Sequence, residues 1–182
     1  MRLFFAVALP SSVRSALARL QTTDAAYRWV DAEQLHVTLA FLGEQPESRL
    51  AELESIGQAA AGASDASTLH LGQPGSFGPR SAPRVLWIGL AGDLSALLHL
   101  ASALTERLRD AGFPVEDRPL QPHITLARRR ERGPGGSPVP WPPPEAPTSA
   151  TIPLDQLILF QSRLSPRGAT YVPLGQFPLR PR

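Results

Sequence analysis

The chain has 182 residues, of which 42% are hydrophobic, and this length and composition suit one globular domain with a buried core. Its 18 basic residues are all arginine, its formal net charge is +2, and it contains neither cysteine nor lysine. These counts exclude disulfides, thiolate metal sites and mechanisms that need a lysine nucleophile, and the lack of cysteine suits a reducing cytoplasm.

In the N-terminal half, the hydrophobic pattern predicts two strands that are each followed by a helix. The first apolar run lies at the lower length limit of a secretory signal and is soon followed by Arg14, so we expect a buried strand there. The expected elements are a strand over 2–9, a helix that begins at 10–12, a strand over 35–42 that Gly43 ends, and a helix that begins at 46–47.

In the C-terminal half, the clearest element is a helix over 93–111, because leucine and alanine recur there at helical spacing. The expected strands are 68–72, 84–90, 122–128, 152–161 and 170–177, with a turn-rich segment between the first two. Ten of the fifteen residues 133–147 are glycine or proline, which predicts a loop. Residues 1–182 are therefore expected to form one bilobal α+β domain, internally duplicated, with mixed or antiparallel sheets flanked by helices.

The duplication is carried by two similar segments, "LHVTLAFLG" at 35–43 and "PHITLARRR" at 122–130. Alternation along a strand places His36 and Thr38 on one face of the first segment and its aliphatic residues on the other. His123 and Thr125 occupy the same positions in the second segment. If the two strands are related by pseudo-symmetry, both His-Thr pairs face one cleft.

Two histidines across a small cleft can act as general base and general acid, because their ordinary pKa leaves both protonation states accessible near neutral pH. Threonine hydroxyls beside them can hold the non-bridging oxygens of a phosphodiester. Arg128 follows the second motif and is the candidate for a contact with a substrate phosphate. Phe41 is expected to pack in the core, since strand parity places it on the aliphatic face.

A zinc site is the competing interpretation of the two histidines. It would need a third protein ligand, and neither motif strand contains an acidic residue. His70 and His99 lie in no comparable context, and His99 is expected at the surface. We therefore expect a site without metal or cofactor.

The sequence resembles the two-histidine phosphoesterases, specifically the bacterial and archaeal RNA 2′,3′-cyclic phosphodiesterases, also named 2′-5′ RNA ligases. The resemblance runs through "MRLFFAVALP", "WVDAEQLHVTLAFLGE", "PRVLWIGL", "RPLQPHITLAR" and "LILFQSRLSPRGATYVPLGQFPL". It implies a bilobal fold with a central cleft and metal-independent opening of an RNA 2′,3′-cyclic phosphate to a 2′-phosphate. It also implies that His36 and His123 are catalytic, and that Thr38, Thr125 and Arg128 bind the substrate.

We hypothesise that His123 activates water while His36 protonates the departing O3′, although near-symmetry leaves the reverse open. One alternative function is ATP-independent 2′-5′ RNA ligation, in which an RNA 5′-hydroxyl replaces water. Another is a non-catalytic protein that binds RNA ends. The expected partners are RNA ends or nucleotides that bear a 2′,3′-cyclic phosphate, with no membrane association, and the protein is expected to be a cytoplasmic monomer.

Overall fold

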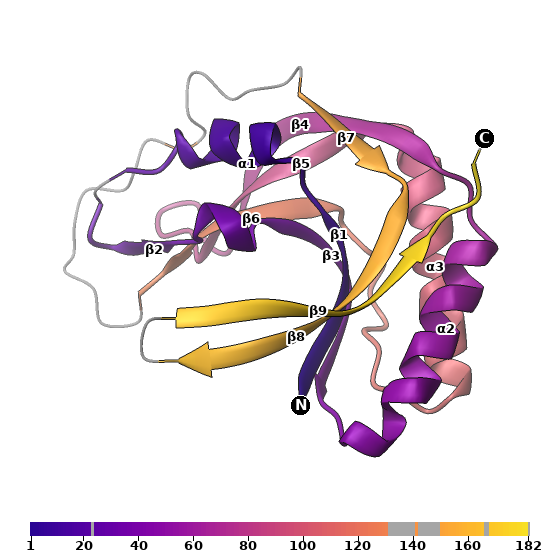
Figure 1. Ribbon diagram of the computed structural model, residues 1–182. Helices are drawn as coiled ribbons and strands as arrows, with labels where there is room; N and C mark the ends of the chain where they lie inside the picture. Colours follow the sequence, from indigo (N-terminus) through magenta and orange to yellow (C-terminus); the bar gives the residue numbers. More distant parts are fainter. Residues whose placement is uncertain (23, 131–140, 142–149, 166–167, 182) are drawn as a thin grey trace.

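A computed structural model describes residues 1–22, 24–130, 141, 150–165 and 168–181, and its strands form one curled sheet with helices packed against it (Figure 1). All pairs between neighbouring strands are antiparallel. The predicted α+β architecture with antiparallel strands and flanking helices is confirmed. No helix in the described ranges is long and apolar enough to cross a bilayer.

The described elements follow the predicted order, except that a short strand, β2, is added and the last-but-one predicted strand is divided into β7 and β8. The strands are β1 Arg2–Ala8, β2 Tyr27–Trp29, β3 His36–Glu44, β4 Ser67–Phe77, β5 Val85–Gly92, β6 His123–Arg129, β7 Thr151–Leu154, β8 Gln156–Ser165 and β9 Gly168–Pro178. The helices are α1 Ser11–Ala18, α2 Leu50–Gly62 and α3 Leu94–Asp110, and short 3₁₀ helices span Ala32–Gln34 and Glu47–Arg49.

The strand order is symmetric about the two motif strands. It runs β7-β4-β5-β6-β3-β1-β8-β9, with β2 paired to β6 beside this series. Each motif strand therefore has three further strands beyond it, and the two half-sheets meet where β3 pairs with β6. This arrangement agrees with the internal duplication that the repeated motif predicts.

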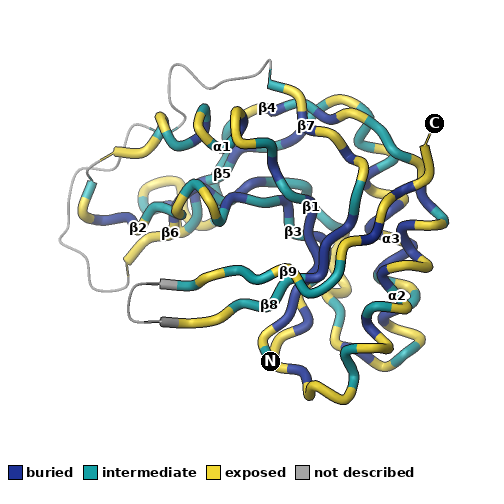
Figure 2. The backbone as a smooth tube through the Cα atoms, in the orientation of Figure 1, coloured by how far each residue is buried: buried dark blue, intermediate teal, exposed yellow. Residues whose placement is uncertain are grey.

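One face of the sheet builds the main core. Val37 and Ile124 on the motif strands are fully buried, as are Leu53 of α2 and Leu104 of α3, and all four belong to one apolar cluster. Figure 2 shows this concentration of buried residues in the central strands and on the sheet-facing sides of α2 and α3. Most of the apolar positions predicted at helical spacing in α3 are buried, whereas Leu98 lies at the edge of this face and is 43% exposed.

Strand β3 continues past the glycine that was expected to end it. Gly43 adopts a φ of +66°, a conformation that glycine reaches without steric cost. The ladder with β1 shifts register at this point and then resumes, so that Arg2 pairs with Glu44. Gly43 therefore marks a β-bulge, and the predicted strand end was wrong.

Strand β4 also runs further than predicted, through a stretch that was expected to form a turn. It reaches Phe77, and its ladder with β5 shifts register between Leu71 and Pro74. A bulge is where a strand tolerates proline, because the missing N–H costs no ladder hydrogen bond there. The actual turn begins at Gly78, which has a φ of +98°.

The expected strand over 152–161 is two strands that break at Asp155. β7 pairs with β4 at one edge of the sheet, whereas β8 pairs with β1 in the other half. The apolar run that spans both strands hides this crossing in the sequence. The predicted loop over 133–147 lies outside the described residues, apart from Trp141.

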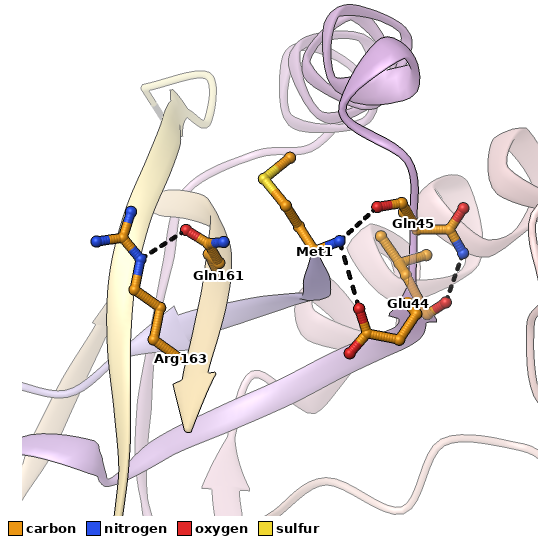
Figure 3. A network of polar contacts seen from close by, with 6 residues as sticks. Met1, Glu44, Gln45, Gln161 and Arg163 are labelled. Carbon is orange, nitrogen blue, oxygen red and sulfur yellow. Dashed lines mark hydrogen bonds and ion pairs between the residues drawn. The ribbon is translucent and has the colours of Figure 1, made fainter. Parts of the chain in front are cut away.

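Polar contacts fix the ends of β1 and β3 against each other (Figure 3). The Met1 ammonium donates to the Gln45 carbonyl at 2.6 Å and lies 3.3 Å from the Glu44 carboxylate. The Gln45 side chain in turn donates to the Leu42 carbonyl at 2.6 Å. These contacts support the register of the strand pair that carries the first motif.

Candidate active site

The pairing of β3 with β6 brings the two His-x-Thr motifs together. Val37 and Ile124 are register partners in this antiparallel pair, so each histidine lies across from the threonine of the other motif. Side chains on the diagonal of such a pair lie about 7–8 Å apart at Cα, which is the spacing expected between the two histidines. All four motif residues thus share the face opposite the main core.

A backbone carbonyl orients each imidazole. His36 Nδ1 lies 2.6 Å from the Gln34 carbonyl oxygen, and His123 Nδ1 lies 2.8 Å from that of Gln121. Because a carbonyl oxygen only accepts, each Nδ1 carries a proton and donates it, which leaves Nε2 as the acceptor of the neutral ring. His36 Nε2 lies 2.9 Å from the Thr38 hydroxyl oxygen, so this hydroxyl donates to the neutral ring.

The two residues whose carbonyls accept these hydrogen bonds are also repeated in the sequence, although the predicted motif did not include them. The repeat begins two residues earlier, since Gln34 and Gln121 precede the two histidines at the same spacing. The contact itself uses the backbone, which residue types do not reveal. The Gln34 side chain instead donates to the carbonyl of Ala169 on β9 and so ties the first motif to the β8–β9 hairpin.

Two aromatic rings also pack against each imidazole, and one of each pair meets it edge-on. Ring centroids lie between 5.0 and 6.0 Å from those of the histidines. The contacts are Phe4 and Tyr171 on His36, and Phe77 and Trp87 on His123. These rings come from β1, β9, β4 and β5, so only the tertiary structure reveals their place in the site.

The environment of His36 disfavours its charged form. Burial lowers the pKa of His36 below its ordinary value of 6.5, the hydrogen bond to Gln34 opposes this shift, and the charges of Arg128 and His123 lower the pKa further. The ring of His36 is therefore neutral in the free protein at neutral pH. The two motifs are alike in sequence, yet burial distinguishes their histidines.

A cavity of about 840 Å³ opens in front of the motifs. Its lining includes Thr38, His123, Thr125 and Arg128, together with residues of α3 and of the segment 115–121. His36 is not part of the lining, and it reaches the cavity through its contact with the Thr38 hydroxyl. The cavity can hold a small anion between the threonines, with room for a larger group beyond it.

Phe41 lies at this cavity, and its expected place in the core was wrong. Its side chain is 56% exposed and lines the cavity together with the exposed Leu98. The ladder between β1 and β3 shifts register on both sides of the segment that pairs Phe4 with Phe41. Each bulge adds a residue to one strand and reverses the alternation, so simple parity counted from His36 fails at Phe41.

Arg128 is the arginine of the second motif that the structure places in the cavity wall. Burial raises the pKa of Tyr171 and lowers that of His36; the charge of Arg128 opposes the first shift and adds to the second. The guanidinium is thus close enough to the motifs to interact with an anion that they bind. Arg129 and Arg130 follow it and are exposed, whereas Arg132 lies outside the described residues.

The other two histidines lie apart from the motifs. His99 is exposed on α3, with a ring nitrogen 3.4 Å from the Ala63 carbonyl oxygen, which confirms its predicted surface position. His70 lines a separate concavity of about 590 Å³ beside Trp87 and Gln121. In the part of the chain that the structure describes, no three histidine, aspartate or glutamate side chains are grouped so that they could hold a metal ion.

Comparison with known proteins places this site in a family. The model of the 2′-5′ RNA ligase superfamily matches residues 9–141, a range that includes both motifs. The chain belongs to this superfamily. A curated relative from Thermus thermophilus, an RNA 2′,3′-cyclic phosphodiesterase, is 36% identical over 99% of this chain and 91% of its own length.

Solved structures share the fold of this superfamily member over its full length. A crystal structure of a Thermus thermophilus protein is similar with a TM-score of 0.85 and 33% identity, and the match covers 100% of both chains. Escherichia coli LigT in complex with 3′-AMP has a TM-score of 0.80 and 31% identity, covering 98% of this chain and 97% of LigT. The fold is therefore that of the two-histidine phosphoesterases.

The environment of His36 predicts its titration in the free protein. Because burial penalises the imidazolium, NMR resonances of the His36 ring should titrate with a midpoint below pH 6.5. A His36 midpoint at or above pH 6.5 would show that the site is more hydrated than the structure indicates.

Proposed function

We propose that this protein is a metal-independent RNA 2′,3′-cyclic phosphodiesterase that leaves a 2′-phosphate. The observation that carries the proposal is the meeting of two His-x-Thr motifs at one cavity, each with its Nδ1–H held by a carbonyl. That hydrogen bond assigns acid-base chemistry to the other ring nitrogen, Nε2, which at His36 accepts the Thr38 hydroxyl proton in the free protein. Curated relatives from Thermus thermophilus and Escherichia coli are RNA 2′,3′-cyclic phosphodiesterases, which supports the same activity here.

The proposed reaction is an in-line displacement at phosphorus. Water attacks the cyclic phosphate and transfers a proton to one histidine, while the bond between phosphorus and O3′ breaks and O3′ takes a proton from the other histidine. The hydroxyls of Thr38 and Thr125 donate to the non-bridging oxygens, and Arg128 offsets their negative charge. A 2′-phosphomonoester and a free 3′-hydroxyl remain, and proton exchange with solvent restores both histidines before the next turnover.

We assign His123 as the base and His36 as the acid. His123 lines the cavity directly, where a solvent water can reach it, whereas His36 lies outside the lining with its Nε2 beside the Thr38 hydroxyl. The lowered pKa of His36 makes its protonated form a strong acid, although a rare one in the free protein. The anionic phosphate favours protonation of His36 when it enters, so this assignment couples substrate binding to proton uptake.

The same residues can run the related transesterification. If an RNA 5′-hydroxyl takes the place of water, the identical proton transfers join two RNA ends through a 2′-5′ linkage. The superfamily takes its name from this ligation. Hydrolysis is the proposed main reaction because water at about 55 M competes with any RNA hydroxyl unless a second RNA end is held in place.

We further propose that residues 1–182 act as one bilobal domain and as a monomer. Both motifs come from a single chain, so the site needs no residue from a second copy. RNA ends or nucleotides with a 2′,3′-cyclic phosphate are the proposed partners, and LigT provides a precedent for nucleotide binding because it is known in complex with 3′-AMP. A cytoplasmic location fits an RNA substrate and a chain without cysteine.

Replacing either motif histidine should abolish most of the turnover. We expect His36→Ala and His123→Ala each to lower kcat by about 10²–10⁴-fold, because each removes one proton transfer. His99→Ala is the matched control, since His99 is exposed on α3 and does not line the cavity. Full activity in both motif variants, measured with 2′,3′-cyclic AMP, would refute the proposed catalytic pair.

The pH dependence of the residual activity of His123→Ala should test the role of His36 as the acid. Because His36 acts in its protonated form, the rate of this variant should fall as the pH rises through the lowered pKa of His36, below pH 6.5. A rate that rises with pH over this range, measured as kcat/KM, would exchange the two roles.

Phe41 should contribute to binding of the nucleobase. Stacking of a base on an aromatic ring is worth about 1–3 kcal/mol, so Phe41→Ala should raise KM for 2′,3′-cyclic AMP by about tenfold with little change in kcat. Phe41→Tyr keeps the ring and should restore KM. The KM for a cyclic phosphate without a base, such as glycerol 1,2-cyclic phosphate, should be unchanged in both variants. An equal rise in KM for both substrates would indicate a structural role of Phe41.

A further inference from the structure

The end of β6 that points away from the motifs carries an unusual density of positive charge. Six of the 18 basic residues of the chain lie there, on β2, on β6 and its continuation, and in the turn between β4 and β5. All six are exposed. This surface, here called the arginine edge, consists of Arg28, Arg80, Arg84, Arg128, Arg129 and Arg130.

Strand pairing holds the arginine edge together. Arg28 and Arg128 are register partners between β2 and β6, so their side chains leave the same face of the sheet. Val85, the partner of Arg128 on β5, lines the cavity, which identifies this face as the one that carries the motifs. The amide of Arg130 donates to the Ala26 carbonyl at 2.9 Å and fixes the backbone beyond the strand.

The arginine edge begins at the proposed phosphate site. Arg128 belongs both to it and to the cavity lining. From Thr125 to Arg130 the chain advances five residues, or about 17 Å at the rise of a β-strand. This length matches several nucleotides of a stacked single strand, which rises about 3.4 Å per nucleotide.

Few carboxylates neutralise the arginine edge. None of its six members forms an ion pair with an aspartate or glutamate among the described residues. Asp24 is a nearby carboxylate, and its Oδ1 accepts the amide hydrogen of Ala26 at 2.7 Å. Arg129 interacts with the hydroxyl of Tyr27, which is a neutral partner at ordinary pH.

The part of the cavity lined by α3 and the segment 115–121 has a different charge. It carries the carboxylates of Glu106, Glu116 and Asp117 beside Arg109 and Arg118. A polyanion that leaves the motifs therefore meets mixed charge in one direction and, in the other, arginines that have no ion pair within the described ranges. Coulomb attraction favours the second path.

We propose that the arginine edge binds the sugar-phosphate backbone of the RNA upstream of the terminal cyclic phosphate, so that the preferred substrate is an oligonucleotide end. This inference rests on the proposed function, because it assumes that the terminal phosphate lies between the two motifs. Guanidinium groups suit phosphate oxygens in charge and geometry. The contacts are made to the backbone, so they favour length over sequence.

The test compares an RNA decanucleotide that ends in a 2′,3′-cyclic phosphate with 2′,3′-cyclic AMP. The double variant Arg28→Gln/Arg130→Gln should raise KM for the decanucleotide about tenfold at low salt and leave cyclic AMP turnover unchanged. For a single strand, each lost phosphate contact lowers the slope of log affinity against log salt by about 0.7. The double variant should therefore reduce this slope by about 1.4.

Arg180→Gln is the matched control, because Arg180 is exposed, lies next to Asp65 beyond the end of β9, and carries the same charge. It should leave both KM and the salt dependence unchanged. The control removes one charge and the double variant removes two, so a control loss of half the size on a logarithmic scale would reduce the effect to net charge. An unchanged KM in the double variant would overturn the inference.

Binding of a decanucleotide with a terminal 2′-phosphate, measured by fluorescence anisotropy, separates the two proposals. If the protein hydrolyses neither substrate yet binds this RNA through Arg28 and Arg130, the proposed function fails while the RNA surface stands. If it hydrolyses 2′,3′-cyclic AMP and its KM for the decanucleotide is no lower than its KM for cyclic AMP, the proposed function stands and the RNA surface is refuted.

Discussion

The pairing of Val37 with Ile124 is the contact on which the site depends. It joins the two half-sheets of the strand order. Because β3 and β6 are antiparallel, each histidine lies across from the threonine of the other motif. Both residues are fully buried in the cluster that includes α2 and α3, so the core that stabilises the fold also fixes the distance between the half-sites. A shift of one residue in the register of either strand would turn its motif side chains toward the core.

Symmetry in the sequence does not produce symmetry in the environment. Both imidazoles donate from Nδ1 to a carbonyl two residues earlier, but His123 lines the cavity, whereas His36 contacts it through Thr38. Burial lowers the pKa of His36. The two half-sites are thus equivalent in sequence, but the strands packed around them give the two histidines different environments. Such a difference allows two identical side chains to act as acid and base.

The sequence was sufficient to predict the motif strands, the long helix α3 and the α+β fold, because strict alternation and helical spacing report directly on burial. Prediction failed where the backbone departs from regular geometry. The bulges between β1 and β3 reversed the parity on which the placement of Phe41 rested, and the bulge in β4 concealed a strand in a segment rich in glycine and proline. The four aromatic rings around the histidines could not be predicted, since they reach the site from β1, β4, β5 and β9 through pairings that no local pattern specifies.

Identification of the product from an RNA oligonucleotide that ends in a 2′,3′-cyclic phosphate, in the presence of EDTA and without ATP, tests the central claim most directly. The account predicts complete conversion to the 2′-phosphate, with an unchanged rate when the chelator is added, and ³¹P NMR distinguishes this product from the 3′ isomer. A 3′-phosphate product would show that O2′ leaves instead of O3′. Loss of turnover that returns with a divalent metal would contradict catalysis by the two histidines alone.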